Sequence, residues 1–475
     1  MRRHTRLILI AAFAAGCATN PVTGRSELAL VSEAQEIQMG REYAEQVKAS
    51  LGLYEDPALQ AYVSRLGMAL AEESERPGIP WQFNVIDDAS VNAFALPGGP
   101  VFITRGILSH MNSEAELVSV LGHEIGHITA RHSVSQMSQQ QLLGLGLGIG
   151  SILSPTVADL SGVASAGLSV LFLKHGRDDE KQSDELGFKY MVREGYDPRE
   201  MASMFETLQR TGGSPEGRLP EWLSTHPNPE NRETATMARV DSLNRDVGTM
   251  RVGRDDFIRH LDGMTFGMNP REGFFRNGLF LHPDLRFQFR IPEGWQAQNT
   301  KQAVMAVSAE QDAIIQLTLG QGSPQQAAQT FFNQQGMQSS NVSSNSVNGN
   351  PAVSGYFQAQ TQQGTLRGIA TWIQYGNATY QFLGYTPAAR YSAYDATLRQ
   401  VIGSFSRVTD PAVLNVQPAK VSLVRVPSNM SVTEFNRRYP SSIPVEQVAI
   451  INGVDAGGTL RAGTMAKRVT GGVSE

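Results

Sequence analysis

Two histidines separated by three residues, with a glutamate directly after the first, are the side chains in this sequence best arranged for chemistry. They lie in the segment His123-Glu124-Ile125-Gly126-His127. On a helix, residues four positions apart project from the same face, so the two imidazoles could bind one zinc ion. Glu124 would stand beside the ion, where it could take a proton from an attacking water. The pattern predicts a hydrolase that cleaves peptide bonds with one zinc ion per chain.

The residues around this motif predict a helix that is partly buried. Ser113 and Glu116 have the spacing of a capping box, in which the serine caps the helix and the glutamate reaches back to it. Apolar residues then recur at helical spacing as far as Ile128. Gly122 and Gly126 would each weaken a helix by about 1 kcal/mol, so we expect another element or a substrate to approach closely there. The alternative, two histidines on a solvated helix face, fits this pattern less well.

A catalytic zinc site needs a third protein ligand, and an acidic helix expected over residues 176–195 could supply it. Glu180 is the best candidate, and Asp184 follows one turn later on the same face. Asp184 could accept a hydrogen bond from the outer nitrogen of a ligand histidine. Spacing alone leaves the third ligand open, because neighbouring carboxylates compete for the role and the whole face could simply be solvated. The competitors are Asp178, Asp179, Asp184 and Glu185.

Four segments in order resemble the HtpX / CAAX-prenyl-protease family of zinc endopeptidases, most closely its periplasmic branch. The resemblance covers residues 25–240 roughly, and it implies that Glu180 is the third zinc ligand and Asp184 its supporting partner. Ser183 stands where the family usually has alanine, a change between small residues. The four segments are Asn92–Gly99, His123–His127, Glu180–Asp184 and Ser224–Arg232.

The resemblance also implies roles for His226 and Arg232. In the periplasmic branch the matching histidine can occupy the fourth zinc position and hold the enzyme inactive. A loop imidazole next to a proline is chemically suited to that role, although a surface or capping histidine is the plainer alternative. Arg232 could orient substrate or stabilise negative charge at the cleaved carbonyl, and a structural ion pair is an equal alternative.

The remaining histidines have structural interpretations. His132 is expected to end the zinc helix, where a cation suits the helix dipole. The others show no ligand spacing around them, or lie in the N-terminal segment: His4, His110, His175, His260 and His282.

Three short apolar segments ahead of the zinc helix predict a small antiparallel sheet, with a turn at Pro97–Pro100. In related zinc peptidases an edge strand of such a sheet pairs with an extended substrate through main-chain hydrogen bonds. The resemblance places this edge at Asn92, Ala93, Phe94 and Ala95, which implies broad specificity for unfolded chains. A purely structural hairpin is the alternative. The three segments span residues 81–86, 91–95 and 101–104.

The N-terminus has the features of an export signal over residues 1–16. Arginines precede the apolar stretch Leu7–Ala15, which is too short to span a bilayer as a helix. Ala15-Gly16-Cys17 resembles a bacterial lipobox, so we expect Cys17, the single cysteine of the chain, to carry a lipid. Ala18, the residue after Cys17, favours sorting of the lipoprotein to the outer membrane. A cysteine that is not lipidated is the alternative.

Composition limits the classes of partner. A formal net charge of −5 gives no sign of the basic surface that binds nucleic acid. The single cysteine suits an exported protein without disulfides, anchored on the periplasmic side of the outer membrane. The uncharged, glycine-rich segment 141–156 is expected to form a buried helical hairpin over the active site in preference to a membrane span.

The length of 475 residues suggests two or three domains. A zinc metallopeptidase domain is expected over residues 17–250, followed by a separate α+β domain over 275–408 that contains no chemical motif. In that domain a segment rich in serine and asparagine, residues 338–350, is expected to be a loop.

Residues 418–470 resemble a LysM module, which implies a small βααβ fold. The expected helices span residues 431–439 and 444–452. The usual Gly-Asp-Thr near the start is replaced by Pro427–Ser431, so the fold is better supported than peptidoglycan binding.

These observations predict an α+β protein: a mainly helical gluzincin-type zinc peptidase domain with a small antiparallel sheet, an α+β domain and a LysM-like module. The predicted function is zinc-dependent hydrolysis of misfolded or unassembled cell-envelope proteins. Two alternatives are a non-proteolytic chaperone or scaffold whose zinc is kept closed by His226, and a peptidoglycan-associated protein. A complete ligand set with Glu124 favours the enzyme.

Overall fold

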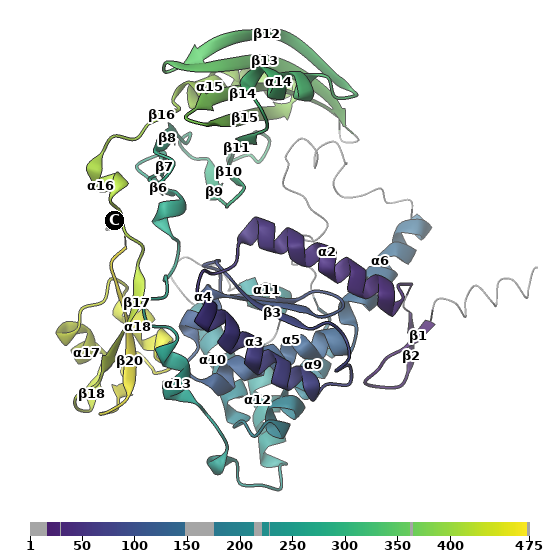
Figure 1. The fold of residues 1–475 in the computed structure, drawn as a ribbon, viewed down its shortest axis with the longest axis vertical. Coiled ribbons are helices and arrows are strands. Elements are labelled where there is room, and N and C mark those ends of the chain that lie inside the picture. The colour runs from purple at the N-terminus through teal and green to yellow at the C-terminus, as the bar shows by residue number, and fades with distance from the viewer. Residues whose placement is uncertain are drawn as a thin grey trace, which may run out of the picture. The chain divides into compact units, whose positions relative to one another are not determined.

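The computed structural model describes two compact units (Figure 1). Unit 1 contains the described residues up to Met268 together with Ala419–Gly472, and unit 2 contains Asn269–Pro418. The predicted signal segment and most of the predicted glycine-rich hairpin, from residue 148 onward, lie outside the described residues. The described residues are 17–28, 30–147, 175–212, 221–227, 229–361 and 364–472.

Unit 1 is mainly helical, as predicted. None of the helices among the described residues has the length and apolar character needed to cross a bilayer. The longer helices are α2 (Glu33–Leu51), α3 (Pro57–Glu72), α5 (Glu114–Thr129), α6 (His132–Leu147), α9 (Arg177–Arg193), α10 (Arg199–Gly212) and α12 (Pro229–Asp241). The shorter ones are α4 (Arg105–His110), α11 (Glu221–Thr225), α13 (Arg254–Arg259) and the 3-10 turn η2 (Val247–Thr249).

Helix α5 carries the zinc motif and is buried along its whole length. The Ser113 hydroxyl caps it by accepting a hydrogen bond from the backbone N–H of Glu116 at 3.0 Å. The second half of the predicted capping box is wrong. The Glu116 carboxylate accepts from the backbone N–H of Asn112, one residue before the cap, because the chain turns there out of α4.

The two glycines of α5 face helix α9. A Cβ atom at Gly122 would lie 3.1 Å from the Cα atom of Gly187, and one at Gly126 would lie 3.0 Å from the Cα atom of Ser183. The predicted close approach is therefore confirmed. The approaching element is the helix that carries Glu180.

The sheet ahead of α5 has the strand order β3-β5-β4, formed by β3 (Gln82–Ile86), β4 (Ala93–Ala95) and β5 (Pro100–Thr104). β4 pairs with β5 antiparallel, as predicted, but β3 pairs with β5 parallel. The prediction of an all-antiparallel sheet is wrong, because the chain crosses from β3 to the far edge before the β4–β5 hairpin brings it back. Gly98 and Gly99 provide the positive φ angles of 76° and 129° in that hairpin.

The two faces of this sheet are covered by different helices (Figure 1). Ala44 and Val47 of α2 pack against Phe102 on one face. Helices α3 and α5 cover the other face, where Val101 and Ile103 join the main core of unit 1. A two-stranded ribbon of β1 (Cys17–Thr19) and β2 (Ser26–Leu28) begins the described chain.

The C-terminal segment of unit 1 has the predicted strand–helix–helix–strand order. β17 (Lys420–Arg425) pairs antiparallel with β20 (Met465–Thr470), and α17 (Val432–Arg438) and α18 (Val445–Ile451) lie between them in the sequence. A short pair of β18 (Met430–Ser431) and β19 (Thr459–Leu460) joins them. Val421 belongs to the main core of unit 1, so this segment packs against the helices of that unit.

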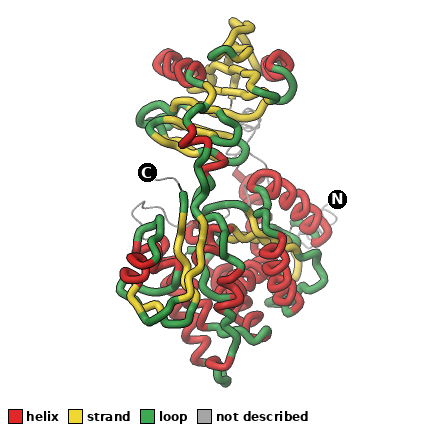
Figure 2. The backbone as a smooth tube through the Cα atoms, turned by 60° about the vertical axis from the view of Figure 1, so that its left-hand side comes forward, coloured by secondary structure: helices red, strands yellow, loops and turns green. Residues whose placement is uncertain are grey.

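Unit 2 combines helices and strands and contains two sheets. Helices α14 and α15 lie on opposite faces of the larger one, since neighbouring residues of β15, Phe382 and Leu383, contribute to separate cores with α15 and α14 (Figure 2). The larger sheet has the order β12 (Met337–Val347), β13 (Asn350–Thr361), β14 (Gly364–Tyr375), β15 (Ala378–Pro387), β11 (Ile314–Gly320), β10 (Ala303–Val307) and β9 (Gln296–Asn299). The smaller sheet has the order β16 (Ser406–Arg407), β8 (Phe287–Arg290), β7 (Leu279–His282) and β6 (Phe274–Arg276). The helical elements are η3 (Pro270–Glu272), α14 (Pro324–Phe332), η4 (Ala388–Arg390), α15 (Tyr391–Gly403) and α16 (Pro411–Leu414).

The prediction of a loop over residues 338–350 is wrong for most of these residues. These residues fall largely in β12, which pairs antiparallel with β13 at the edge of the larger sheet. Its side chains are almost all exposed. An edge strand is held by main-chain hydrogen bonds on one side, so an exposed one can form from serine and asparagine. Because it lacks the apolar side chains typical of a strand, its sequence pattern does not predict one.

Candidate metal centre

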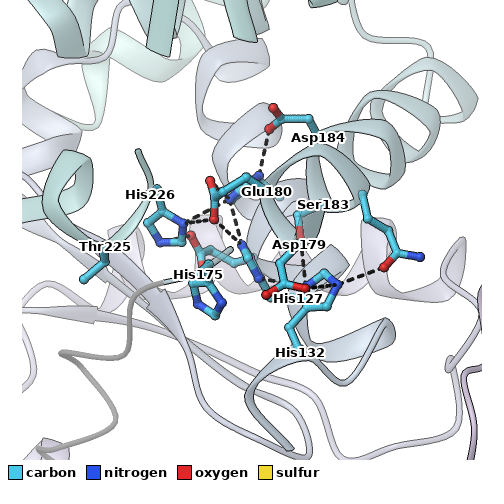
Figure 3. A network of polar contacts seen from close by, with 12 residues as sticks. His127, His132, His175, Asp179, Glu180, Ser183, Asp184, Thr225 and His226 are labelled. Atoms are coloured by element: carbon cyan, nitrogen blue, oxygen red, sulfur yellow. Dashed lines mark hydrogen bonds and ion pairs between the residues drawn. The ribbon is translucent and has the colours of Figure 1, made fainter. Parts of the chain in front are cut away.

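Four buried side chains converge in unit 1: His123 and His127 from α5, Glu180 from α9 and His226, the residue directly after α11. One nitrogen or oxygen atom from each lies within 4.8 Å of the other three. Figure 3 shows Glu180 between His127 and His226. Two or three imidazoles with one carboxylate are a donor set that suits zinc, so these residues could hold the predicted ion.

The distances define which atoms face the common point. The Nε2 atoms of His123 and His127 are 3.0 Å apart. Glu180 Oε1 lies 3.3 Å from His127 Nε2 and 2.9 Å from His226 Nδ1. Burial alone would raise the pKa of the Glu180 carboxyl, but the neighbouring His226 and His123 outweigh burial and hold that pKa well below its usual range. The carboxylate is therefore in the charged form that a metal ion needs.

Asp184, the predicted partner of a ligand histidine, lies on the far side of His123 from the other candidate ligands. Its Oδ1 atom is 2.9 Å from His123 Nδ1, the nitrogen that points away from the common point. Burial would raise the pKa of the Asp184 carboxyl, but the Arg232 guanidinium and the hydrogen bond with His123 hold that pKa below its usual value. A charged Asp184 can accept the Nδ1–H of His123 and leave its Nε2 free.

Arg232 is buried against both carboxylates. Its Nε and Nη2 atoms donate to the two oxygens of Asp184 at 2.8 and 2.6 Å, and its Nη1 atom lies 2.9 Å from Glu180 Oε2. The guanidinium also lies over the ring of Trp222, 4.6 Å from its centroid. This geometry favours the ion-pair interpretation of Arg232 over direct contact with a substrate.

His226 is held in place by the helix that precedes it, α11. Its ring stacks on Trp222, with centroids 4.7 Å apart and planes 25° from parallel. Its backbone N–H donates to the Trp222 carbonyl at 2.8 Å. Burial opposes a charge on the imidazole, but the carboxylates of Glu180 and Glu124 outweigh burial and raise its pKa above the ordinary value.

Glu124 is buried beside these groups. Its Oε1 atom lies 3.7 Å from His226 Nε2, and the indole N–H of Trp222 donates to the same oxygen at 3.5 Å. The carboxylate of Glu124 thus faces the position that the His226 ring occupies. Sequence reasoning did not single out Trp222, because a lone tryptophan ahead of the His226 segment has no spacing that distinguishes it from a core residue.

Two further histidines adjoin the cluster, which the sequence did not reveal. His132 begins α6, so the prediction that it ends the zinc helix is wrong. Its Nδ1 atom lies 3.0 Å from His127 Nδ1. The ring of His175 lies 3.9 Å from that of His127, centroid to centroid. Arg131 has a φ of 60°, which breaks the helix and turns His132 back to the site; arginine gives no sequence sign of such a break.

The predicted substrate strand lies at an edge of the sheet. Ala93, Phe94 and Ala95 form β4, which pairs with β5 and with no other strand among the described residues, and Asn92 precedes it. The carbonyl of Val91 accepts a hydrogen bond from the backbone N–H of Trp222 at 3.2 Å. Helix α11 therefore contacts the chain next to this edge. Cys17 lies in β1, opposite Leu28.

The sequence comparisons agree on the part of the chain that carries the site. Residues 57–239 match the model of Peptidase family M48. The Beta-barrel assembly-enhancing protease of Escherichia coli (strain K12) is 34% identical over 241 residues, which cover 49% of this chain and 49% of that protein. The Mitochondrial metalloendopeptidase OMA1 of Arabidopsis thaliana is 30% identical over 212 residues, which cover 43% of this chain and 42% of that protein.

The chain spans about half the length of these curated relatives. Among solved structures, cyanobacterial PsbP (CyanoP) from Synechocystis sp. PCC 6803 covers 27% of this chain and 91% of its own, with 14% sequence identity. Its TM-score of 0.24 is too low to support an argument about this protein. All the converging side chains, from His123 to Arg232, lie between residues 57 and 239, so the candidate metal centre falls wholly within the match to peptidase family M48.

Proposed function

We propose that this chain is a zinc-dependent endopeptidase that hydrolyses peptide bonds of misfolded or unassembled cell-envelope proteins. The observation that carries the proposal is the convergence of buried ligand side chains beside Glu124, inside the M48 match. In this proposal His123, His127 and Glu180 hold one zinc ion, and Asp184 and Arg232 orient the ligands from behind.

Glu124 is the proposed general base. A bound zinc ion would make water nucleophilic at neutral pH and polarise the carbonyl to be cleaved. Glu124 would take the proton of the attacking water and pass it to the leaving amine. The indole N–H of Trp222 orients the Glu124 carboxylate for this transfer.

His226 is the proposed fourth ligand of a closed state. Its Nδ1 atom lies among the other ligand atoms and its ring faces Glu124, so an attacking water has to replace it. Release of His226 would require movement of α11. Because α11 also holds Val91 through Trp222, the same movement would free the chain beside β4 for an extended substrate.

The proposed substrate class is supported by a relative, and the proposed location by the N-terminal sequence. The name of the Escherichia coli relative refers to assembly of β-barrels, and we propose substrates of that kind for this chain. The export signal and Cys17 support a lipid anchor on the periplasmic side of the outer membrane. Incorporation of labelled palmitate by the wild type, and its absence from Cys17→Ala, would test the anchor.

The decisive variant for the enzyme is Glu124→Gln, in protein lacking residues 1–17. Zinc content would be measured together with cleavage of casein and of an unfolded outer-membrane protein. We expect about one zinc ion per chain in both proteins and a loss of roughly 10²–10⁴-fold in cleavage by the variant. Glu185→Gln, the same substitution at a residue paired with Arg239, is the matched control.

Two results would reject this proposal. Undiminished cleavage by Glu124→Gln would remove the general base from the account. If the zinc-loaded wild type and the zinc-loaded His226→Ala variant both failed to cleave either substrate, the chaperone or scaffold alternative would be favoured.

Peptidoglycan association is a second candidate function, for residues 418–470. The strand–helix–helix–strand order and the β17–β20 pair support a LysM-like fold. Co-sedimentation of the chain lacking residues 1–17 with purified sacculi would support binding. A protein that stays in the supernatant at every sacculus concentration would reject it.

A further inference from the structure

The two histidines of the zinc motif have different partners on their outer nitrogens. The Nδ1 atom of His123 faces the carboxylate of Asp184. The Nδ1 atom of His127 faces the Nδ1 atom of another imidazole, His132, at 3.0 Å. Figure 3 shows His132 on the side of His127 away from His226.

The opposite nitrogen of His132 also has a partner. Its Nε2 atom lies 2.9 Å from the side-chain oxygen of Gln182, on the helix that carries Glu180. The His132 side chain is buried, with 4% of the residue exposed. The rings of His127 and His132 meet edge to face, with planes 75° apart. His127, His132 and Gln182 therefore form a continuous chain of hydrogen bonds from α5 through the start of α6 to α9.

The proton positions in this chain follow from its two ends. His127 Nε2 faces the other ligand atoms, so as a metal ligand it carries its proton on Nδ1. The Nδ1 atom of His132 must accept a hydrogen bond from this Nδ1–H group of His127, so His132 Nδ1 is itself unprotonated. The single proton of a neutral His132 then lies on Nε2, where the oxygen of Gln182 accepts it. Each bond has one donor and one acceptor.

We propose that His132 is a positioning residue for the zinc ligand His127, which it holds in the Nδ1–H tautomer and in a fixed ring orientation. The inference rests on the proposed function insofar as His127 binds zinc. It assigns to His132, whose Nε2 atom also lies 3.7 Å from Asp179 Oδ1, the task that Asp184 performs for His123. Outer partners of this kind change metal affinity by 10–100-fold in other zinc proteins.

Substitution of His132 separates this role from simple packing. His132→Phe keeps a ring but has no acceptor, whereas the amide oxygen of His132→Asn can take the place of Nδ1. Zinc affinity would be measured by competition with a chromophoric chelator, and thermal unfolding would be followed on the zinc-free proteins. We expect zinc to bind 10–100-fold more weakly to His132→Phe and within about threefold of wild type to His132→Asn.

His260→Phe is the matched control, because His260 stacks on Tyr62 and contacts none of the four candidate ligands in the part of the chain that the structure describes. Equal zinc affinity for wild type and a folded His132→Phe would overturn the inference while leaving the proposed function intact. A wild type that binds no zinc would instead overturn the proposed function.

A measurement on the wild type keeps the inference testable if His132→Phe fails to fold. Nitrogen-15 resonances of the imidazoles in the zinc-loaded protein report which nitrogen carries the proton. The inference requires a protonated Nε2 and an unprotonated Nδ1 for His132. A protonated Nδ1 on His132 would contradict it, because His127 could then donate no hydrogen bond to it.

Discussion

The backbone N–H of Trp222 donates to the carbonyl of Val91 across 3.2 Å, and this bond ties the helix that presents His226 to the chain beside the edge strand. Trp222 also stacks on His226 and donates to Glu124. One short helix thus contacts the fourth ligand position, the proposed base and the proposed substrate edge. In the proposed enzyme this arrangement is the closed state.

Removal of His226, the proposed fourth ligand, should activate the proposed enzyme. His226→Ala leaves His123, His127 and Glu180 as ligands, so we expect zinc content to stay near one per chain while cleavage of unfolded protein rises at least tenfold. Ser224→Ala, on the exposed side of the same helix, should cleave at the wild-type rate. Activity that falls in His226→Ala with zinc still bound would show that His226 assists the reaction and does not restrain it.

The packing of α5 on α9 should tolerate no side chain at Gly187. A Cβ atom there would lie 2.9 Å from the backbone nitrogen of His123, closer than real contacts allow. We expect Gly187→Ala to lower the free energy of unfolding by about 1–3 kcal/mol and to reduce zinc occupancy, since the helices that carry the ligands must separate. Thermal unfolding and metal analysis would measure both effects.

Gly403→Ala is the control for that substitution. Gly403 ends α15, and a Cβ atom there would meet nothing within 4 Å. Its effect on stability should be small. If Gly187→Ala behaved in the same way, the close contact between α5 and α9 would not constrain the site.

Arg232 and Asp184 should act as a unit on metal affinity. Asp184→Asn removes the charge that accepts from both His123 and Arg232, and Arg232→Lys keeps the charge but loses the two parallel hydrogen bonds. We expect each variant to bind zinc about 10–100-fold more weakly, and the double variant to lose less than the product of the two effects. Chelator competition would give the affinities, and fully multiplicative losses would show that the residues act independently.

The C-terminal segment should stabilise the rest of unit 1 through Lys467. The buried side-chain nitrogen Nζ of Lys467 donates to the carbonyls of Ser109 and Met111 at the end of α4, at 3.0 Å for the former. Burial lowers the pKa of Lys467 well below its usual value. Lys467→Met leaves two buried carbonyls without this donor, so we expect a loss of about 1–3 kcal/mol in unfolding free energy.

Lys420→Met, at an exposed position of the same small sheet, should change stability by less than about 0.5 kcal/mol. Denaturant unfolding would measure both variants. Equal stability of Lys467→Met and wild type would mean that the C-terminal segment is attached to unit 1 without supporting it.

Local patterns in the sequence predicted the two helices that carry His123, His127 and Glu180, and the small residues between those helices. Gly122 and Gly126 indicated close approach because glycine destabilises a helix and is expected there only where space is short. Gly187 on the other helix is the residue that approaches Gly122. The convergence of His226 on Glu180 could not follow from spacing, because the two lie in separate segments of the chain; the resemblance alone suggested it.

The sequence was least informative where main-chain geometry decides the outcome. His132 reaches His127 only because Arg131 adopts a positive φ. The parallel pairing of β3 and β5 depends on the path of the connecting chain, and β12 is held by its neighbour and not by apolar side chains. None of these features leaves a periodic pattern of residues.

Removal and return of zinc would test the central claim most directly. The protein lacking residues 1–17, with His226→Ala to open the site, would be stripped with a chelator, dialysed and then titrated with zinc while cleavage of an unfolded outer-membrane protein is followed. The account predicts no cleavage by the stripped protein and full recovery at one zinc ion per chain. Cleavage that persists without zinc, or that does not return when zinc binds again, would contradict it.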